Sequence, residues 1–277
     1  MLRRFVMCRL LGIVSSEHTR FRFYLREAPR ILASLSQQHP HGWGVAVHAA
    51  NIGWRIEKKA MCAGEDADFH DLASESQGEI LLAHVRKRTV GPFAQQNTHP
   101  FRRGRWVFAH NGTIDRVDLL RDSTSTARRA QIEGHTDSEH LFAFLLTHLD
   151  EAGVADTPAD ARTDAALQRA TRAALAWPSL GSINFLLSGG DALYAFRSGR
   201  PLFMLERLPG DHVRAERRSA ETGAVLETPW SSRRHAVIVA SEQITDEPWS
   251  PIAEGTLLRI SYSGGVKSAT IGAGEPE

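Results

Sequence analysis

The order of strand-like and helix-like segments constrains this fold more than any other feature of the sequence. Short apolar or alternating segments come first, two helical segments occupy the middle, and strand-like segments return afterwards. The stronger helix is expected over 139–149, where apolar residues fall on most faces, and the second over 163–176. Helices therefore do not alternate with strands, which argues against a parallel Rossmann-like sheet. The sequence predicts an α+β fold with antiparallel sheets.

The individual elements follow from apolar periodicity and from turn residues. Further helices are expected over 21–38 and 67–76. Irregular structure is expected over 156–163, over 213–228 and from Gly272 onward. The expected strands are 9–14, 42–49, 54–60, 80–86, 105–110, 182–187, 192–197, 236–240 and 256–262.

The charge of the chain is almost balanced, with 33 basic and 32 acidic residues among 277. No strong field exists to attract nucleic acid or an anionic membrane, so neither is expected as a partner. Two cysteines do not make a disulfide framework, and the histidines lack the paired spacing of a structural zinc site, so no metal is expected. Neither a membrane span of roughly 20 apolar residues nor a secretory signal is present, which favours a cytoplasmic protein.

Cys8 directly follows Met7, and this pair suggests an N-terminal nucleophile. A methionine before a small residue is a normal substrate for initiator removal, which would leave cysteine with a free α-amine. The unperturbed amine has a pKa of about 8 and the thiol one of about 8.5, so one residue can supply both base and nucleophile. The plain alternative is a small core residue beside an apolar strand.

Two strand ends carry polar groups that suit a substrate site. Arg86 ends the apolar segment ILLAHVR, where a guanidinium can grip a carboxylate through two parallel hydrogen bonds. An ordinary solvent-exposed arginine is the alternative. Asn111 and Gly112 follow RWVFAH and suit an oxyanion hole, formed by a side-chain amide and a backbone N–H. The alternative there is a hairpin turn, because Asn-Gly between apolar runs is a strong hairpin signal.

Asp137 lies in the segment TDSE at the start of the long apolar helix. Thr-x-x-Glu is the capping-box pattern, so this aspartate has a plain explanation as part of a helix start. Its functional alternative is to pair with an ammonium group of a ligand.

Together these segments resemble the class II glutamine amidotransferases, which belong to the N-terminal-nucleophile hydrolases, and most closely their short single-domain branch. Each motif is weak alone, but their joint order and spacing are specific. The resemblance implies a four-layer αββα sandwich in one domain over 8–270. The motifs are MCRLLG at 7–12, HGWG at 41–44, AHVR at 83–86, NTHPF at 97–101, AHNG at 109–112, TDSE at 136–139, and ASE at 240–242 with Thr245, Asp246 and Trp249.

The resemblance also implies a reaction. Cys8 would attack the side-chain amide of glutamine, with its own α-amine relaying the proton. Asn111 and Gly112 would stabilise the tetrahedral oxyanion. Ammonia would leave, and water would resolve the thioester to glutamate, with no metal or organic cofactor.

The same resemblance assigns the substrate-binding residues. Arg86 would hold the α-carboxylate of the substrate and Asp137 its α-ammonium. Thr98 and His99 belong to the loop that would bind the substrate. Together these groups would select a γ-glutamyl group that carries a free amino-acid head.

Two departures from the family pattern shape the expectation. Cys8 is not residue 2, so residues 1–7 are expected to be non-native or removed, with Met7 as the favoured start. Larger members carry a domain that uses the ammonia, and no such domain is expected here. Ammonia would therefore pass to a separate partner protein, or the true substrate is not glutamine.

Two alternatives to glutamine hydrolysis stay open. The same site could cleave a larger γ-glutamyl conjugate, as in the ergothioneine-pathway branch. From a different class comes a catalytically dead binding module on the same fold. His84, His99 and His110 are expected to support the site rather than react, and Cys62 is expected to be structural.

Overall fold

The chain folds into two groups of β-strands and a smaller set of helices. The structure is a computed structural model that describes residues 8–27, 41–86, 92, 94–210, 233–263 and 265–272. The strands are β1 (Arg9–Arg20), β2 (Trp43–Ala49), β3 (Gly53–Lys59), β4 (Gln77–Val85), β5 (Phe101–Arg103), β6 (Trp106–Ile114), β7 (Gly181–Ser188), β8 (Ala192–Arg197), β9 (Phe203–Arg207), β10 (Ala236–Ala240), β11 (Ser250–Pro251), β12 (Thr256–Ser261) and β13 (Val266–Thr270). The helices are the π-helix η1 (Phe23–Glu27), the 3₁₀-helices η2 (Ala63–Glu65) and η3 (Gln95–Asn97), and the α-helices α2 (Ala67–Glu75), α3 (Val117–Asp122), α4 (Thr126–Arg129), α5 (Asp137–Glu151) and α6 (Ala161–Ala176).

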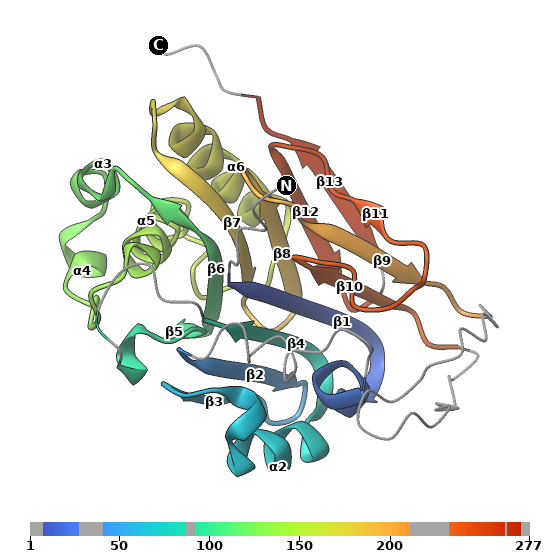
Figure 1. The fold of residues 1–277 in the computed structure, drawn as a ribbon. Helices are drawn as coiled ribbons and strands as arrows, with labels where there is room; N and C mark the ends of the chain where they lie inside the picture. The colour runs from blue at the N-terminus through green and yellow to red at the C-terminus, as the bar shows by residue number, and fades with distance from the viewer. Residues whose placement is uncertain are drawn as a thin grey trace, which may run out of the picture.

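Two antiparallel sheets form the centre of the molecule (Figure 1). One has seven strands in the order β11-β9-β10-β1-β4-β2-β3, and the other has six in the order β13-β12-β8-β7-β6-β5. Every neighbouring pair in both sheets is antiparallel, as the sequence predicts. β1 lies near the middle of the seven-stranded sheet, between β4 and β10, and Cys8 directly precedes it.

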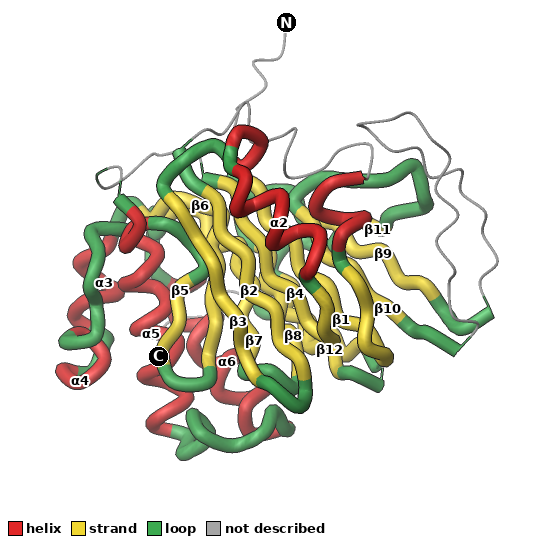
Figure 2. Tube along the Cα trace, turned by 90° about the horizontal axis from the view of Figure 1, so that it is seen from below, coloured by secondary structure: helices red, strands yellow, loops and turns green. Residues whose placement is uncertain are grey.

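Helices cover the outer faces of both sheets, and the inner faces pack on each other. α5 and α6 bury apolar side chains against the six-stranded sheet, while α2 and η1 do so against the seven-stranded sheet. Figure 2 shows α2 on one side of the strands, with α5 and α6 on the other. A third apolar core lies between the sheets. The four-layer αββα sandwich of the N-terminal-nucleophile hydrolase type is therefore confirmed.

Strand alternation decides which side chains face the gap between the sheets. On β1, Leu10 and Val14 belong to the inter-sheet core, so Cys8 has the parity of that face. On β6, Ala109 belongs to the same core, which gives Asn111 the inter-sheet parity. Phe108 packs on the helix side, and the neighbouring even positions of β6 share that parity. Cys8 and Asn111 therefore project from facing sheets into one gap.

Most expected elements are found, with shifted ends. The strand expected over 9–14 continues to Arg20, and the one expected over 105–110 continues to Ile114. The helix expected over 21–38 is represented by η1, and its remainder, like 213–228 and the end of the tail, lies outside the described residues. Helix α6 begins at Ala161, inside a segment that was expected to be irregular. The strands and helices not expected from the sequence are β5, β9, β11, β13, η2, η3, α3 and α4.

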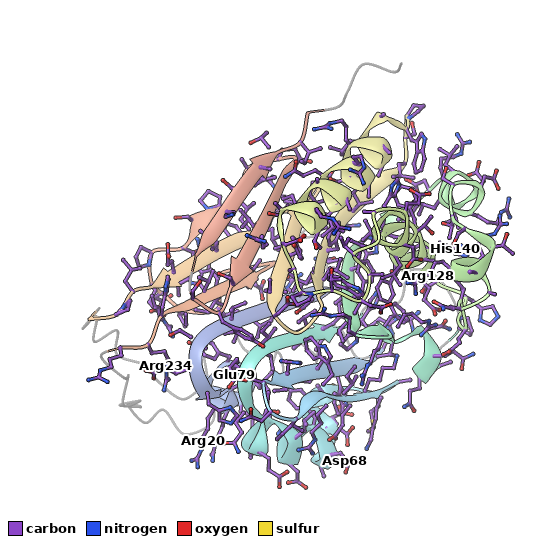
Figure 3. The ribbon with its side chains drawn as sticks, turned by 180° about the vertical axis from the view of Figure 1, so that it is seen from behind. Arg20, Asp68, Glu79, Arg128, His140 and Arg234 are labelled. Carbon is purple, nitrogen blue, oxygen red and sulfur yellow. The ribbon has the colours of Figure 1, made fainter. Side chains whose placement is uncertain are left out.

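The periphery carries charges of both signs, which agrees with the balanced composition. Arg20 and Asp68 are exposed and lie at the outside of the molecule (Figure 3). Among the described helices, none is long and apolar enough to cross a membrane. Within the same ranges, no group of histidine, cysteine or acidic residues is arranged to hold a metal ion.

Candidate active site

Cys8 lies at the entrance of β1 and is partly exposed. Its strand is held on both sides. Leu10 pairs with His84 of β4, and on the other side it exchanges hydrogen bonds of 3.1 Å with the backbone and hydroxyl of Ser241, just beyond β10. Arg9 also makes an ion pair of 3.1 Å with Glu242. These contacts hold Cys8 in the position that the strand register gives it.

Arg86 lies directly after β4 and is only 3% exposed. The alternative of an ordinary solvent-exposed arginine is therefore wrong. The register pairs Arg9 with Val85, so Arg86 reaches the same end of the sheet as Cys8. Its backbone N–H donates to the Gly42 carbonyl at 2.7 Å, and one guanidinium N–H donates to the Pro92 carbonyl at 3.4 Å. A buried cation is thus held beside the nucleophile candidate.

Asn111 and Gly112 lie inside β6 and do not form a turn, so the hairpin alternative is wrong. They pair with Asn184 and Ile183 in a register with β7 that runs from Val107 to Ile114. Continuous pairing with a buried neighbour strand outweighs the local turn preference of Asn-Gly. The Asn111 side chain is 3% exposed and makes no hydrogen bond to the described residues. A buried amide without an internal partner is suited to a ligand oxygen.

The backbone N–H of Gly112 points away from β7. Along β6 the bonding direction alternates, and Asp115 donates its N–H at 2.9 Å to the segment that leads into β7. Even positions therefore turn their N–H groups to the opposite edge, as Ile114 does when it donates to Asp137 Oδ2 at 2.8 Å. β5 covers that edge only opposite 106–108. The Gly112 N–H thus faces an edge that no described strand pairs.

Glycine at position 112 is required by its neighbours. A Cβ atom there would lie 1.9 Å from the Ser182 carbonyl oxygen and 2.4 Å from His110 Nε2. Both contacts are far below van der Waals distance. The sequence suggests this glycine for close approach to a substrate, and the structure adds that β7 and an imidazole occupy the place of a side chain.

We expect Gly112→Ala to lower the free energy of unfolding by at least about 1–3 kcal/mol, because overpacking forces a buried strand or ring to move. Urea denaturation of the purified variant measures the change. Gly272→Ala is the matched control, since a Cβ at Gly272 has no atom within 4 Å. A Gly112→Ala midpoint equal to that of the control would contradict the packing argument.

Asp137 is the first residue of α5 and is 6% exposed. The cap is supplied by Thr136, whose hydroxyl accepts from the Glu139 N–H at 3.3 Å. Asp137 instead ties the helix to β6, accepting from the Ile114 N–H at 2.8 Å and from the Ser138 N–H at 3.0 Å. Its carboxylate lies two residues beyond Gly112 along the chain direction of β6 and keeps acceptor capacity for an ammonium group.

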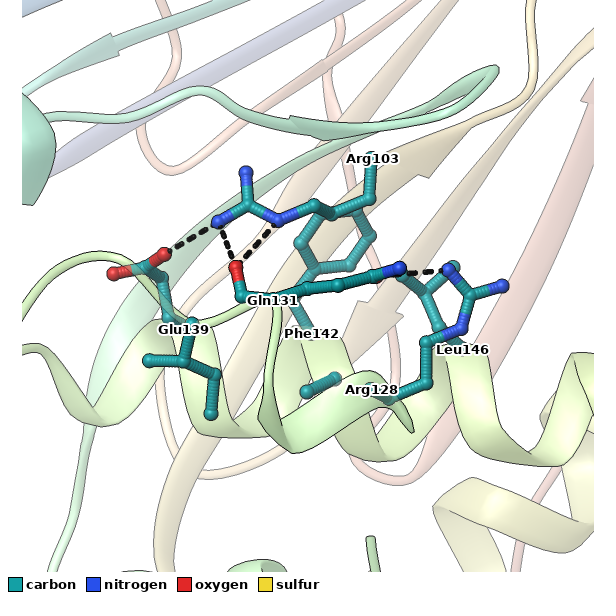
Figure 4. A pocket seen from close by; sticks show the side chains of 8 residues that line it. Arg103, Arg128, Gln131, Glu139, Phe142 and Leu146 are labelled. Atoms are coloured by element: carbon teal, nitrogen blue, oxygen red, sulfur yellow. Dashed lines mark hydrogen bonds and ion pairs between the residues drawn. The ribbon is translucent and has the colours of Figure 1, made fainter. Parts of the chain in front are cut away.

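The capping-box pattern is half realised. Glu139 does not return to the Thr136 N–H; its carboxylate accepts from the Gly134 N–H at 2.7 Å and from Arg103 at 3.0 Å. Figure 4 shows this arginine bridging Glu139 and the Gln131 carbonyl in a hollow over α5. The glutamate therefore fixes the loop before α5, and that loop in turn fixes Asp137.

The segment with Thr98 and His99 packs tightly on β2 and β3. Thr98 is fully buried, and its hydroxyl donates to the Ala94 carbonyl at 3.2 Å. A Cβ on Gly44 would lie 2.0 Å from the His99 carbonyl oxygen, so this glycine lets the segment approach the sheet. Lys58 donates to the Thr98 carbonyl at 2.8 Å, and burial lowers the pKa of this lysine to about 8.

His99 is a buried imidazole with its ring centroid 4.3 Å from that of His84. Neither ring nitrogen of His99 has a hydrogen-bond partner among the described residues. Burial, followed by the nearby His84, His110, Arg86 and Lys58, holds the pKa of His99 well below its usual range. The ring is therefore neutral at pH 7 and packs as an uncharged buried side chain rather than as a cation.

We expect the free energy of unfolding to fall as the pH drops below about 6.5, the pKa of an unfolded histidine. There the unfolded chain binds a proton that buried His99 refuses. The contribution of His99 to the free energy of unfolding is therefore complete above that pH. It is lost as the pH falls toward the pKa of His99 in the folded protein, by at most about 1.4 kcal/mol per pH unit. Urea titrations at several pH values should give His99→Asn a shallower slope than wild type. The exposed His135→Asn serves as control, and identical slopes in all three proteins would contradict the assignment.

His110 connects β6, β7 and α5. Its Nε2 lies 3.1 Å from the Ser182 carbonyl and its Nδ1 lies 2.9 Å from the Ser138 hydroxyl. A carbonyl can only accept, so Nε2 carries the proton and Nδ1 accepts from the serine. Burial lowers the pKa of His110, which keeps this neutral form. The ring thus positions β6 against α5, the helix that carries Asp137.

Arg200 is a site residue that the sequence did not indicate. It lies between β8 and β9, where its Nε donates to the Ser182 hydroxyl at 2.9 Å and its Nη2 donates to the Thr113 hydroxyl at 3.4 Å. Burial lowers the pKa of Arg200, while the nearby Cys8 and Asp137 raise it. The guanidinium is therefore within electrostatic reach of both predicted site residues.

Asn184 was also missed, although the sequence carries a signal for it. It stands in the otherwise apolar stretch INFLL of β7, directly opposite Asn111, and is fully buried. Its amide donates to the Arg200 carbonyl at 2.9 Å and accepts from the Ser198 N–H at 2.8 Å. A buried amide in an apolar strand must find such partners, which is the clue that sequence reasoning could have used.

Comparison with known proteins agrees with this arrangement. The family model for class II glutamine amidotransferases matches residues 7–273. A γ-glutamyl-hercynylcysteine sulfoxide hydrolase from Mycobacterium tuberculosis is 30% identical over 208 residues, which cover 74% of this chain and 77% of the relative.

Solved structures resemble the fold. A glutamine aminotransferase class-II domain protein from Silicibacter pomeroyi has a TM-score of 0.62 at 20% identity, over 96% of this chain and 100% of that one. Glutamine phosphoribosylpyrophosphate amidotransferase from B. subtilis also has a TM-score of 0.62, at 18% identity over 96% of this chain and 50% of that one. Such low identities show the fold alone. Because the family model covers nearly the whole chain, this protein belongs to the class II glutamine amidotransferases and is an amidohydrolase.

Proposed function

We propose that this chain hydrolyses a γ-glutamyl amide bond through a thioester on Cys8, with glutamine as the simplest substrate. The observation that supports the proposal is the strand parity by which Cys8 and Asn111 project from facing sheets into one gap, with Arg86 at the Cys8 end of its sheet and Asp137 beyond Gly112. One sulfur, two oxyanion donors and two opposite charges are what the reaction requires.

In the proposed mechanism, the Cys8 sulfur attacks the amide carbon and its α-amine accepts the thiol proton. The carbonyl oxygen becomes an oxyanion, which the Asn111 amide and the Gly112 N–H stabilise. The C–N bond then breaks as the ammonium of Cys8 returns the proton to the leaving nitrogen. Water, activated by the same amine, attacks the thioester and releases the glutamyl acid.

Substrate selection follows from the two charged residues. Arg86 is buried and can make two parallel hydrogen bonds to the α-carboxylate. Asp137 can accept from the α-ammonium. These two charges would fix the γ-carbonyl over Cys8, and an effective molarity gain of this kind supplies a large part of many enzymatic accelerations.

The free α-amine requires that residues 1–7 be absent from the working enzyme. These residues lie outside the described ranges. The family match begins at Met7, which supports Met7 as the initiator and its removal as the step that exposes Cys8.

The direct test is covalent trapping. A diazoketone analogue of glutamine should label the purified protein once, and peptide mass spectrometry should place the label on Cys8. Glutamate and ammonia should appear together when glutamine replaces the analogue. Labelling elsewhere, or no glutamate from any γ-glutamyl amide, would refute the proposal.

A second candidate is hydrolysis of a larger γ-glutamyl conjugate by the same residues. The relative named γ-glutamyl-hercynylcysteine sulfoxide hydrolase favours it. Amine release from a γ-glutamyl conjugate, measured beside ammonia release from glutamine, separates the two. A conjugate preference of more than about tenfold in kcat/KM, or about 1.4 kcal/mol in transition-state binding, would select the second candidate.

A further inference from the structure

The two charged residues assigned to the substrate head come from different layers of the molecule. Arg86 directly follows β4 of the seven-stranded sheet, whereas Asp137 begins α5, which packs on the six-stranded sheet. In an amino-acid head, the carboxylate and the ammonium are bonded to the same carbon atom. The two side chains must therefore be held at a fixed separation, because a misplacement of about 1 Å can cost about 100-fold in rate.

Asn97 joins the two loops that carry this separation. It ends η3, between β4 and β5, and is fully buried. Its Nδ2 donates to the Pro92 carbonyl at 3.0 Å, and its Oδ1 accepts from the His135 N–H at 2.8 Å. Since a carbonyl can only accept and a backbone N–H can only donate, these partners fix the orientation of the amide. One buried amide thus holds two segments that are distant in the sequence.

The donor end of the amide leads to Arg86. The Pro92 carbonyl that accepts from Asn97 also accepts from Arg86 Nη1 at 3.4 Å. The next residue, Thr98, packs on Gly42, where a Cβ atom would lie 3.0 Å from Thr98 Oγ1. The Gly42 carbonyl in turn accepts from the Arg86 N–H at 2.7 Å. Asn97 and Thr98 therefore contact the partners of both the guanidinium and the backbone of Arg86.

The acceptor end of the amide leads to Asp137. His135, whose N–H donates to Asn97, stands two residues before Asp137 in the loop that enters α5. Gly134 is enclosed from two sides, since a Cβ atom there would lie 2.6 Å from Asn97 Oδ1 and 2.3 Å from Glu139 Oε2. The Gly134 N–H also donates to Glu139 at 2.7 Å. The loop is thus held between Asn97 and α5, and its position sets where Asp137 begins the helix.

We propose that Asn97 is a positioning residue that sets the separation between Arg86 and Asp137, and that it thereby makes the enzyme specific for a head with both charges. This inference rests on the proposed function. Asn97 acts through the Pro92 carbonyl and through the loop with His135. Loss of its amide loosens both contacts to the head together, whereas loss of either charged residue removes one contact.

Three amides test this coupling: glutamine, glutaramic acid, which lacks the α-ammonium, and 4-aminobutanamide, which lacks the α-carboxylate. Ammonia release gives kcat/KM for each. Wild type should prefer glutamine to either truncated amide by about 10- to 100-fold, the range expected for a hydrogen bond to a charged group. Asn97→Ala should lower both preferences by at least about fivefold, because neither charge keeps its place. A ratio of two substrates within one variant is independent of the amount of folded protein, so a purely structural role would not change it.

Asn97→Asp tests the two ends of the amide separately. Aspartate keeps an acceptor for the His135 N–H but has no donor for the Pro92 carbonyl, and its negative charge competes with the substrate for Arg86. Asn97→Asp should therefore lower the preference for glutamine over 4-aminobutanamide and keep the preference over glutaramic acid within about twofold. The two side chains have the same shape, so this variant tests the inference even if Asn97→Ala does not fold.

Ser188→Ala is the matched control. The buried Ser188 hydroxyl likewise donates to one carbonyl, that of Ala192 at 2.6 Å, and accepts from one backbone N–H, that of Gly190 at 3.1 Å. It lies at the turn between β7 and β8, so its loss should lower stability and leave both preferences unchanged.

Two results would overturn the inference: unchanged preferences in the Asn97 variants, or an equal change in Ser188→Ala. If wild type does not prefer glutamine to either truncated amide, the head assignment in the proposed function is wrong, and the role of Asn97 falls with it.

Discussion

Cys8→Ala should abolish turnover of every γ-glutamyl substrate while leaving the protein folded. The covalent step has no other nucleophile at this position, so we expect kcat to fall by at least about 10⁴-fold. Alanine removes one sulfur from a partly exposed position at the entrance of β1, where the strand is already held by pairing on both sides. Glutamate release measures the rate, and circular dichroism with a thermal scan measures the fold.

Cys62→Ala is the matched control for this substitution. Cys62 is buried just before η2 and follows the edge strand β3, so its loss should cost some stability and leave kcat unchanged. Retained turnover in Cys8→Ala would remove Cys8 from the mechanism. Loss of turnover in both variants would point to a general effect of removing thiols.

The amine half of the mechanism needs its own comparison. Protein translated from Met7 and protein translated from Met1 differ only in residues 1–6 before any processing. Intact mass establishes which form begins at Cys8. A general base contributes typically 10²–10⁴-fold, so a form that keeps Met1 should be slower by about that factor or more. Equal rates from a form shown by mass to retain Met1 would contradict the α-amine as base.

The fold was largely predictable because its strong signals are local. The apolar periodicity of α5 and the largely apolar, buried runs of β2, β8 and β10 belong to continuous segments, and each element is found. β5 and β11 are very short, and the edge strand β13 is mostly polar on its exposed side. The sequences of these three strands are therefore no more strand-like than the sequence of a loop. These strands exist because a neighbour pairs with them, which is information the local sequence does not carry.

The site residues also differ in whether a local sequence pattern indicates them. Cys8, Asn111 and Asp137 stand in compact motifs, whereas Arg200 is tied to the site by bonds that span 18 and 87 residues of sequence. No local pattern marks Gly-Arg-Pro as part of a site. The turn that Asn-Gly suggests is absent for a related reason, because pairing with β7, which is distant in the sequence, decides the conformation there.

Asn111→Ala should slow the chemical step by about 10²–10³-fold, or about 2.7–4 kcal/mol of barrier, as for loss of one oxyanion donor. KM should change little, because the head of the substrate is held by other residues. Stability should also change little, since the Asn111 side chain makes no hydrogen bond to the described residues that the substitution could break.

Asn184→Ala is the matched comparison, because the two asparagines face each other across β6 and β7. The Asn184 amide holds Ser198 and Arg200, and its loss leaves buried groups unsatisfied, at about 1–3 kcal/mol of unfolding free energy. Stopped-flow rates and urea midpoints for both variants should therefore separate. Asn111→Ala should have a lower rate and an unchanged urea midpoint, while Asn184→Ala should have a lower urea midpoint. A kcat within threefold of wild type for Asn111→Ala would mean that the oxyanion is bound elsewhere, because a donor in that place cannot be removed without slowing the step it stabilises.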